Sequence, residues 1–151
     1  MAEKFEFPSP EQNSKKHGFE SLEKYIDFDK KQPEKYYYNE SSAIYSRLAS
    51  EVTERGVIYQ WRRQYVRANK SGVAPTLTAN MGMGGHNVPI IKAKHGIRKL
   101  TPNECFRLMG FDRLKFKPGT ADSRLYKQAG NAVVVDVIER IAENIKLALL
   151  Q

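Results

Sequence analysis

The strongest concentration of side chains that could recognise a ligand lies between residues 60 and 70. This stretch combines arginines, amides and aromatic rings, in the order Gln60, Trp61, Arg62, Arg63, Gln64, Tyr65, Val66, Arg67, Ala68, Asn69 and Lys70. An arginine can donate two hydrogen bonds to the O6 and N7 acceptors of guanine, whereas asparagine and glutamine suit adenine. We interpret the stretch as an exposed strand that can read base edges. The rings of Tyr59, Trp61 and Tyr65 are expected to face the core, which leaves about half of the arginines exposed.

A glycine-rich loop follows, between Pro75 and Pro89. It contains Gly82, Gly84 and Gly85, so three of four consecutive positions lack a side chain. Such a loop lets the backbone approach a ligand closely and exposes its amide groups, as contact with a phosphate or a groove edge requires. The loop has neither the ending of a Walker loop nor a dinucleotide-binding fingerprint, which disfavours nucleotide binding. An ordinary glycine-rich hairpin, with its histidine as a hydrogen-bonded loop residue, is the alternative.

The net charge of +8 is concentrated in one part of the chain. Between Arg55 and Asn103, a stretch of 49 residues, there is no aspartate or glutamate, and the rest of the chain holds 16 basic and 17 acidic residues. The basic residues of this stretch are Arg55, Arg62, Arg63, Arg67, Lys70, Lys92, Lys94, Arg98 and Lys99. A region of one sign suits a polyanion, because each cation placed on a phosphate releases counterions. A basic surface that only improves solubility is the alternative; no basic amphipathic helix supports membrane binding.

Several other classes of protein are disfavoured. No apolar run approaches the roughly 18 residues of a membrane span, and residues 1–10 lack the apolar core of a signal peptide. We therefore expect a soluble, cytoplasmic protein. Cys105 is the only cysteine and the three histidines are scattered along the chain, so neither a disulfide nor a metal site is expected.

The elements that must position these residues follow from the spacing of apolar side chains. Ile44, Leu48 and Val52 fall at four-residue spacing and predict a helix over residues 41–56. Short segments rich in Val, Ile, Tyr and Thr then predict a small sheet, with strands at 56–61, 64–67, 75–79 and 88–92.

Two helices are predicted near the C-terminus. Thr101, Pro102 and Glu104 form a capping box with proline at the first helical position, and Gly110 stops this short helix. The last helix begins after Asn131 and is amphipathic. Its apolar face consists of Val134, Val137, Ile138, Ile141, Ile145, Ala148 and Leu149. Because so small a chain offers little apolar surface to cover this face, we expect a docking site on another domain or subunit.

Three segments, in this order, resemble the C-terminal third of bacterial DNA (cytosine-5)-methyltransferases. They are Pro75-Thr76-Leu77-Thr78-Ala79 with the glycine loop after it, Arg98-Lys99-Leu100-Thr101-Pro102-Asn103-Glu104-Cys105-Phe106-Arg107-Leu108-Met109-Gly110-Phe111, and Leu125-Tyr126-Lys127-Gln128-Ala129-Gly130-Asn131-Ala132-Val133. The resemblance covers residue 56 to the end closely and the first forty residues loosely.

The resemblance implies a role for individual residues. Thr76 and Leu77 match the Thr-Leu pair that ends the variable recognition region, where the threonine lies beside the flipped-out cytosine nucleotide. With the flanking loops in the major groove, the implied DNA-binding residues are Arg62, Arg63, Arg67, Asn69, Lys70, Thr76, Leu77, Asn80, Gly82, Gly84, Gly85, His86 and Asn87. Residues 98–110 resemble the ninth motif, which organises the recognition domain, so Cys105 resembles a packing residue.

The third segment resembles the tenth motif, which lines part of the pocket for S-adenosyl-L-methionine. The implied cofactor-binding residues are Gly130, Asn131, Ala132 and Val133. Many members of the family have serine where this chain has Ala132, so one hydroxyl contact is absent here.

The residues that carry the chemistry of the family are missing. The family attacks cytosine C6 with the thiolate of a Pro-Cys pair, stabilises the adduct with a Glu-Asn-Val glutamate and binds the cofactor through a Phe-x-Gly-x-Gly loop. None of these motifs is present in the sequence. Cys105 follows Glu104 rather than a proline, and Glu143-Asn144-Ile145 is expected on the solvent side of the last helix. No catalytic residue is assigned to this chain.

The sequence thus predicts an α+β fold, in which a small, twisted, mostly antiparallel sheet is followed by a short helix and a long C-terminal amphipathic helix. The expected divisions are an extended lead-in over residues 1–40, a target recognition domain with the ninth-motif helix over 41–125, and the tenth-motif turn with the last helix over 126–151.

The leading hypothesis is a recognition subunit or fragment of a methyltransferase from a restriction-modification system. It would bind double-stranded DNA and work with an N-terminal catalytic half, sharing S-adenosyl-L-methionine with it and using no metal. A non-catalytic DNA-binding module or a degenerate remnant of a truncated gene is the alternative. An RNA-binding domain is disfavoured because no aromatic pair has a spacing typical of RNA stacking.

Overall fold

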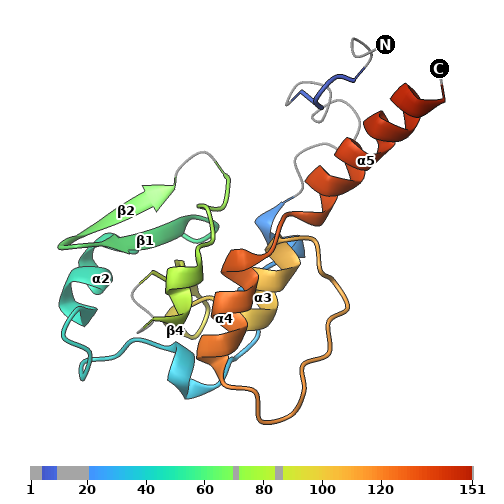
Figure 1. Ribbon diagram of the computed structural model, residues 1–151. Coiled ribbons are helices and arrows are strands. Elements are labelled where there is room, and N and C mark those ends of the chain that lie inside the picture. The colour runs from blue at the N-terminus through green and yellow to red at the C-terminus, as the bar shows by residue number, and fades with distance from the viewer. Residues whose placement is uncertain (1–4, 10–20, 70–71, 84–86, 151) are drawn as a thin grey trace. The chain divides into compact units, whose positions relative to one another are not determined.

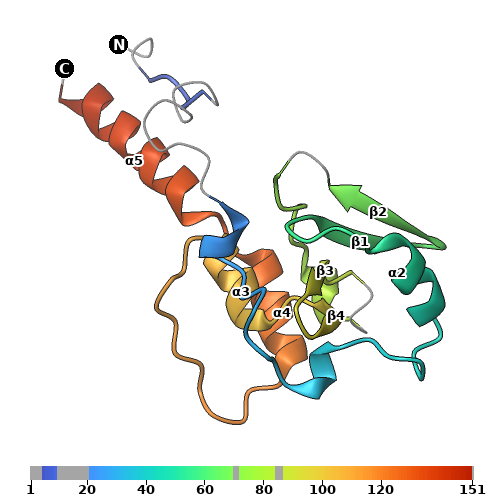
Figure 2. The same cartoon turned by 180° about the vertical axis from the view of Figure 1, so that it is seen from behind.

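A four-stranded antiparallel sheet forms the centre of the region from residue 21 to residue 132, seen from opposite sides in Figures 1 and 2. The computed structural model describes residues 5–9, 21–69, 72–83 and 87–150. The chain divides into two units, one of Ser21–Ala132 and one of Met1–Glu20 with Val133–Gln151. The sheet belongs to the first unit and the last helix to the second.

The strands are arranged in the order β2-β1-β3-β4, and every neighbouring pair is antiparallel. They are β1 (Ile58–Arg62), β2 (Tyr65–Asn69), β3 (Ile90–Ala93) and β4 (Gly96–Lys99). A bridge between Tyr37 and Arg98 and a hydrogen bond from Tyr38 N to Ile97 O (2.9 Å) cover the outer edge of β4. The predicted α+β fold with an antiparallel sheet is confirmed.

Two of the strand assignments need correction. The strand predicted at residues 75–79 is wrong, because this segment has no regular structure before the 3-10 helix η3 (Ala79–Gly82). Pro75 cannot donate to a strand ladder, and Thr78 O instead accepts a hydrogen bond from Met81 N (3.0 Å). The strand β4 was missed because its fully buried residue is Arg98, and a charged residue at an inward position hides the alternating pattern.

Helix α2 (Tyr45–Glu51) covers one face of the β1–β2 hairpin. Leu48 and Val52 are buried and cluster with Tyr59, Val66 and Ile90. Burying an aliphatic side chain of this size stabilises the fold by about 1.5 to 3 kcal/mol. The predicted four-residue spacing is confirmed, although the helix is shorter than the predicted range.

Residues 21–40 pack into the same unit as the sheet. They contain two 3-10 helices, η1 (Leu22–Lys24) and η2 (Glu34–Tyr36). Ile26 and Phe28 are almost fully buried, and Lys94 N donates a hydrogen bond to Phe28 O (2.9 Å). This segment therefore contributes directly to the core.

The predicted capping box is confirmed at the start of helix α3 (Pro102–Leu108). Thr101 Oγ1 accepts a hydrogen bond from Glu104 N (3.3 Å), and a carboxylate oxygen of Glu104 accepts one from Thr101 N (2.7 Å). Gly110 has a φ of +88°, which a glycine adopts without strain, so the helix stops where the sequence predicts.

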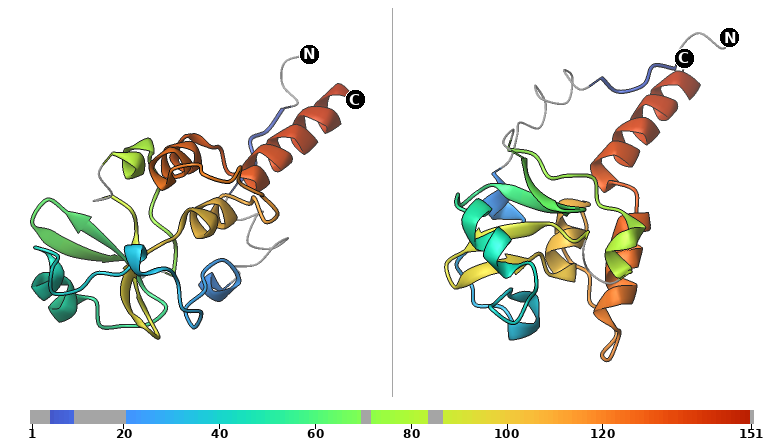
Figure 3. Two further views of the ribbon diagram at one scale, coloured as in Figure 1. Left: turned by 90° about the horizontal axis from the view of Figure 1, so that it is seen from below. Right: turned by 90° about the vertical axis from the view of Figure 1, so that its left-hand side faces the viewer.

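Helix α4 (Asp122–Asn131) was not predicted. Leu125, Tyr126 and Ala129 form its buried stripe. The prediction that Gly130 and Asn131 form a turn before the last helix is wrong, because both residues end α4 itself. Figure 3 shows η3 beside this helix, and the two elements are in extensive contact.

Helix α5 (Val135–Leu149) is the predicted C-terminal helix and belongs to the second unit. None of its residues is buried, and Val137, Ile138, Ile145 and Leu149 are between 42% and 81% exposed. In the same unit Asn144 Nδ2 donates a hydrogen bond to Glu6 O (2.7 Å). Within the described parts of the chain, no helix is long and apolar enough to cross a membrane.

Candidate DNA interface

The β1–β2 hairpin extends beyond the rest of the sheet as a two-stranded ribbon (Figure 1). β1 pairs with β2 along its whole length, from Ile58 opposite Asn69 to Arg62 opposite Tyr65. It pairs with β3 only at Ile58 and Tyr59. Residues 60–67 therefore form a ribbon of two strands and a two-residue turn, which we call the outer ribbon.

The two faces of the outer ribbon have different chemistry. Trp61 and Val66 lie opposite each other and pack towards α2 as part of the core cluster. On the other face Arg62, Tyr65 and Arg67 are all exposed. The side chain of Arg62 is partly fixed, because its Nη2 donates a hydrogen bond to Gln60 Oε1 (3.3 Å). This polar face contains two of the arginines that the sequence suggests for base contacts.

Tyr65 does not lie in the core, contrary to the prediction. The side chain is 55% exposed, whereas Tyr59 is 2% exposed and Trp61 is half-buried, as predicted. Residues 61 and 65 would share a face if the strand ran straight. The turn reverses the chain and pairs Trp61 with Val66, which places Tyr65 on the arginine face.

Arg63 occupies the turn of the outer ribbon with a φ of +56°, the one positive φ among the non-glycine residues that the structure describes. This left-handed conformation costs a residue with a side chain roughly 1 to 2 kcal/mol. No ion pair of the described residues includes Arg62, Arg63 or Arg67. The three guanidinium groups therefore carry positive charge that no acidic neighbour offsets.

The segment after the ribbon holds the predicted Thr-Leu pair. Asn69 Nδ2 donates a hydrogen bond to Val73 O (3.3 Å), which ties the end of β2 to this segment. Thr76 is exposed and available for contact. Leu77 is only 8% exposed, so its side chain packs in the core and holds the segment in place, and its predicted DNA contact stays a prediction.

Two glycines allow this segment to pack tightly on α4. A Cβ atom at Gly130 would overlap the backbone of Thr78 and Ala79, and a Cβ atom at Gly82 would overlap the carbonyl oxygen of Ser123. Gly130 comes from the predicted cofactor-binding segment and Gly82 from the predicted DNA-binding loop. The structure thus joins the two segments by backbone packing, which neither motif indicates.

The remaining predicted DNA-binding residues are divided between exposed and undescribed positions. Asn80, within η3, and Asn87 are exposed. Lys70, Gly84, Gly85 and His86 lie outside the described residues.

A buried ion pair anchors the ninth-motif segment. Arg98 donates hydrogen bonds to both oxygens of the Glu104 carboxylate, at 2.7 and 2.8 Å, and to Asp27 O at 2.8 Å. Glu104 also accepts a hydrogen bond from Asp27 N (2.9 Å). Tyr126 Oη donates to Leu100 O (2.6 Å), which links the same region to α4. This network supports the organising role that the resemblance implies.

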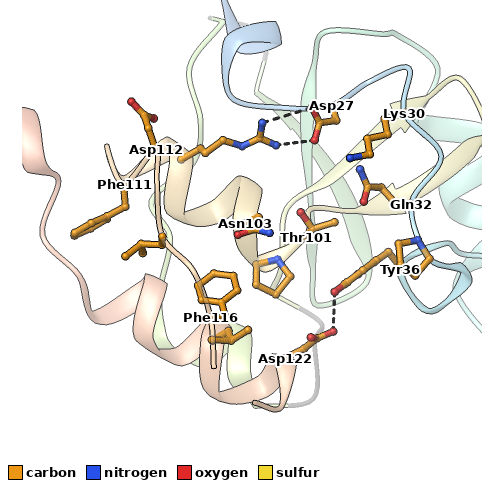
Figure 4. A pocket seen from close by; sticks show the side chains of 15 residues that line it. Asp27, Lys30, Gln32, Tyr36, Thr101, Asn103, Phe111, Asp112, Phe116 and Asp122 are labelled. Atoms are coloured by element: carbon orange, nitrogen blue, oxygen red, sulfur yellow. Dashed lines mark hydrogen bonds and ion pairs between the residues drawn. The ribbon is translucent and has the colours of Figure 1, made fainter. Parts of the chain in front are cut away.

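A cavity of about 510 Å³ lies beside this network, and no predicted site residue lines it (Figure 4). Three of the charged groups that line it are paired with neighbours: Arg107 with Asp27 (2.8 Å), and Asp122 with Lys35 (2.7 Å) and the Tyr36 hydroxyl (2.9 Å). The hydrogen bond to Asp122 raises the pKa of Lys35, and burial raises the pKa of Tyr36. No residue of the outer ribbon lines this cavity, so the cavity is separate from the candidate DNA interface.

Comparison with known protein families identifies the family of this chain. The model of the C-5 cytosine-specific DNA methylase family matches residues 2–147. The chain belongs to this family.

Individual methyltransferases are similar to this chain over different lengths. The type II methyltransferase M.Bsp6I from Bacillus sp. (strain RFL6) is 51% identical over 147 residues, which is 97% of this chain and 45% of that enzyme. The orphan methyltransferase M.Rho11sI of Bacillus phage rho11s is 44% identical over 85 residues (53% of this chain and 17% of the relative), and the type II methyltransferase M.HhaI from Haemophilus parahaemolyticus is 43% identical over 84 residues (52% and 24%). The chain thus spans less than half the length of these relatives.

The one cysteine is poorly placed for the nucleophilic role that the methylase family requires. Cys105 lies in α3 and is fully buried. Burial raises the pKa of its thiol above the usual range, which disfavours the reactive thiolate. The structure therefore agrees with a packing role. Among the described residues, no cluster of three or more His, Cys, Asp or Glu side chains could hold a metal ion.

The predicted cofactor residues do not form a site for S-adenosyl-L-methionine by themselves. Gly130 is closed off by the backbone of Thr78. Asn131 and Val133 are exposed and Ala132 is half-buried, and none of the four lines the cavity beside the ion pair. The residues present fit at most one edge of such a site, and no catalytic step follows from them.

Proposed function

We propose that this chain is the DNA-recognition part of a DNA (cytosine-5)-methyltransferase, equivalent to the C-terminal part of longer family members. Membership of the methylase family gives the reaction, methyl transfer to C5 of cytosine in double-stranded DNA. The outer ribbon carries the proposal, because the exposed residues on one of its faces include arginines that have no acidic partner among the described residues. Candidate contacts are Arg62, Arg63, Arg67 and Thr76, with Asn80 and Asn87 on the loop that follows.

The chemistry is assigned to a catalytic part that supplies the thiolate, the glutamate and the main cofactor loop. C-5 cytosine methylases take the methyl group from S-adenosyl-L-methionine. From this chain, Asn131, Ala132 and Val133 are the candidate edge of that pocket. The similarity to a type II methyltransferase supports a place in a restriction-modification system.

Helix α5 is the proposed docking element for the catalytic part. Its apolar residues are largely exposed, with Ile138 at 48% and Ile145 at 45%. A soluble protein rarely leaves a continuous apolar stripe uncovered, since such stripes mark interaction sites. Covering it with the catalytic part would stabilise both parts.

The proposal is tested by combining this chain with the part of M.Bsp6I that it does not match. One sample mixes the two polypeptides, and another is a chimera in which this chain replaces the matching 147 residues. We expect methylation of cytosine in duplex DNA in both samples and none from either part alone, measured by methyl transfer from labelled S-adenosyl-L-methionine. Folded but inactive chimera and mixture would contradict the proposal and favour a DNA-binding module or a degenerate remnant.

A further inference from the structure

The outer ribbon has the dimensions of an element that reads the major groove. Residues 60–67 pair only with each other, since β3 ends its contact with β1 at Tyr59. Neighbouring strands lie about 4.8 Å apart, and the major groove is about 12 Å wide and admits a two-stranded β-ribbon. A single face of the ribbon can therefore meet base edges while the other remains on α2.

The register sets the spacing of the two arginines on this face. Arg62 lies opposite Tyr65, and Arg67 lies opposite Gln60, so Arg62 and Arg67 are diagonal neighbours across the two strands. Diagonal neighbours are about 7 to 8 Å apart, and stacked base pairs rise by about 3.4 Å. The two guanidinium groups can reach bases that are about two base pairs apart.

Residues next to the two arginines on the ribbon favour this contact with DNA. Gln60 is 8% exposed and its Oε1 accepts a hydrogen bond from Arg62 Nη2, which limits the orientations of that guanidinium. Tyr65, which lies opposite Arg62 and two residues before Arg67 on the same face, is 55% exposed, although a tyrosine ring gains by burial. An exposed ring flanked by unpaired arginines suits a surface that is covered when DNA binds.

We propose that the outer ribbon enters the major groove, where Arg62 and Arg67 each bind a guanine and select two G·C pairs about two base pairs apart. Tyr65 makes the apolar contact between them, and Arg63, at the turn, contacts a phosphate. The inference rests on the proposed function, because it takes duplex DNA as the ligand. It goes further by giving each ribbon residue a separate role and by naming the bases selected.

The test is selection from duplex DNA with a randomised centre, using the full chain and five variants. The wild type should enrich sequences with two guanines at a fixed spacing. Arg62→Ala and Arg67→Ala should each lose the preference at one of these guanines, and a different one in each variant, with roughly 5- to 150-fold weaker binding to the enriched sequence. Arg63→Asn should weaken binding to all duplexes alike and reduce the salt dependence by about one phosphate contact. Tyr65→Ala should weaken binding while Tyr65→Phe should not.

A matched control removes an exposed arginine elsewhere. Arg113 is exposed and belongs to the loop between α3 and α4, a loop that runs away from the ribbon (Figures 1 and 2). Arg113→Ala should leave the enriched sequence unchanged. A cooperative thermal transition at or above the temperature of the wild type would show that each variant folds, as expected for exposed positions. If Arg62→Ala and Arg67→Ala enrich the same sequences as the wild type, the inference is overturned and the proposed function stands. If the wild type binds no duplex, both are overturned.

Discussion

The guanidinium group of Arg98 donates a hydrogen bond to each carboxylate oxygen of Glu104, and neither side chain is exposed to solvent. The pair joins strand β4 to the first turn of α3, and Asp27 joins both through its backbone. A charge buried in this way is stable only while its partner remains. The Arg98–Glu104 pair therefore controls whether the sheet and the helices α3 and α4 stay together.

Removing one member of this pair should be strongly destabilising. Arg98→Met or Glu104→Gln should each lower the free energy of unfolding by about 3 to 5 kcal/mol, measured by urea denaturation. The control is Arg55→Gln, which breaks the exposed pair between Arg55 and Asp29 and should change stability little, because solvent screens the two charges. Equal losses for the buried and the exposed pair would contradict this prediction.

Gly130→Ala and Gly82→Ala should destabilise the fold, although alanine normally favours a helix over glycine. Each added methyl group would overlap backbone atoms, of Thr78 or of Ser123, and such overpacking costs about 1 to 3 kcal/mol. Thermal unfolding measures the loss. Gln128→Ala, at an exposed position of α4, is the control and should change stability little. A gain in stability for Gly130→Ala would show that η3 and α4 are not packed as described.

The elements that the sequence predicts well are those governed by local signals. The capping box at Thr101 and Glu104 and the stop at Gly110 depend on residues within one or two turns, and both are found where expected. The spacing of Leu48 and Val52 likewise marks α2 correctly. Helices and their caps can be predicted from the sequence because the residues that determine them are close together in the chain.

The features that could not be predicted from the sequence depend on contacts between segments that are far apart in the chain. The sequence does not predict β4, because the side chain of Arg98 points inward and pairs with the carboxylate of Glu104, which comes later in the chain, in α3. The sequence does not predict the last turn of α4, because a glycine such as Gly130 suggests a turn that ends a helix. The glycine is needed here because the backbone of Thr78 leaves no room for a side chain. The exposure of Tyr65 follows from the hairpin register, which a one-residue change of the turn would reverse. The roles assigned to the DNA-binding and cofactor residues stay predictions.

Replacing Arg63 should separate stability from DNA binding. Asparagine adopts a left-handed backbone more readily than arginine, so Arg63→Asn should raise the free energy of unfolding by up to about 1 kcal/mol. The same variant loses a positive charge at the turn and should bind duplex DNA more weakly. Urea denaturation and fluorescence anisotropy measure the two effects. A variant that is more stable than the wild type and binds duplex DNA as tightly would show that Arg63 does not contribute to DNA binding.

Stability should fall at alkaline pH through Tyr38. Burial raises the pKa of Tyr38 to about 12 from its ordinary value of 10.0. The unfolded chain therefore releases this proton first, so the stabilisation is complete below pH 10 and is lost as the pH rises to about 12. A shift of this size corresponds to about 3 kcal/mol. Tyr38→Phe should flatten the pH dependence of the free energy of unfolding, and an unchanged pH dependence in this variant would contradict the prediction.

Charging the apolar face of α5 should abolish activity with the catalytic part and leave the sheet unit intact. Ile138 and Ile145 are seven residues apart, two helical turns on the same face, and both are nearly half exposed. The double variant Ile138→Glu, Ile145→Glu would place two carboxylates in an apolar interface, which should weaken docking by at least about 3 kcal/mol, or roughly 100-fold.

Three measurements on the α5 variant distinguish docking from folding. Methylation by the mixture with the catalytic part of M.Bsp6I should be lost, while the thermal unfolding and the DNA binding of the chain itself should match those of the wild type. The control Lys146→Glu changes the charge on the polar face of the same helix and should keep the mixture active. Because α5 buries none of its residues within this chain, a loss of folding in the double variant would contradict a docking role and show that the helix supports this chain instead.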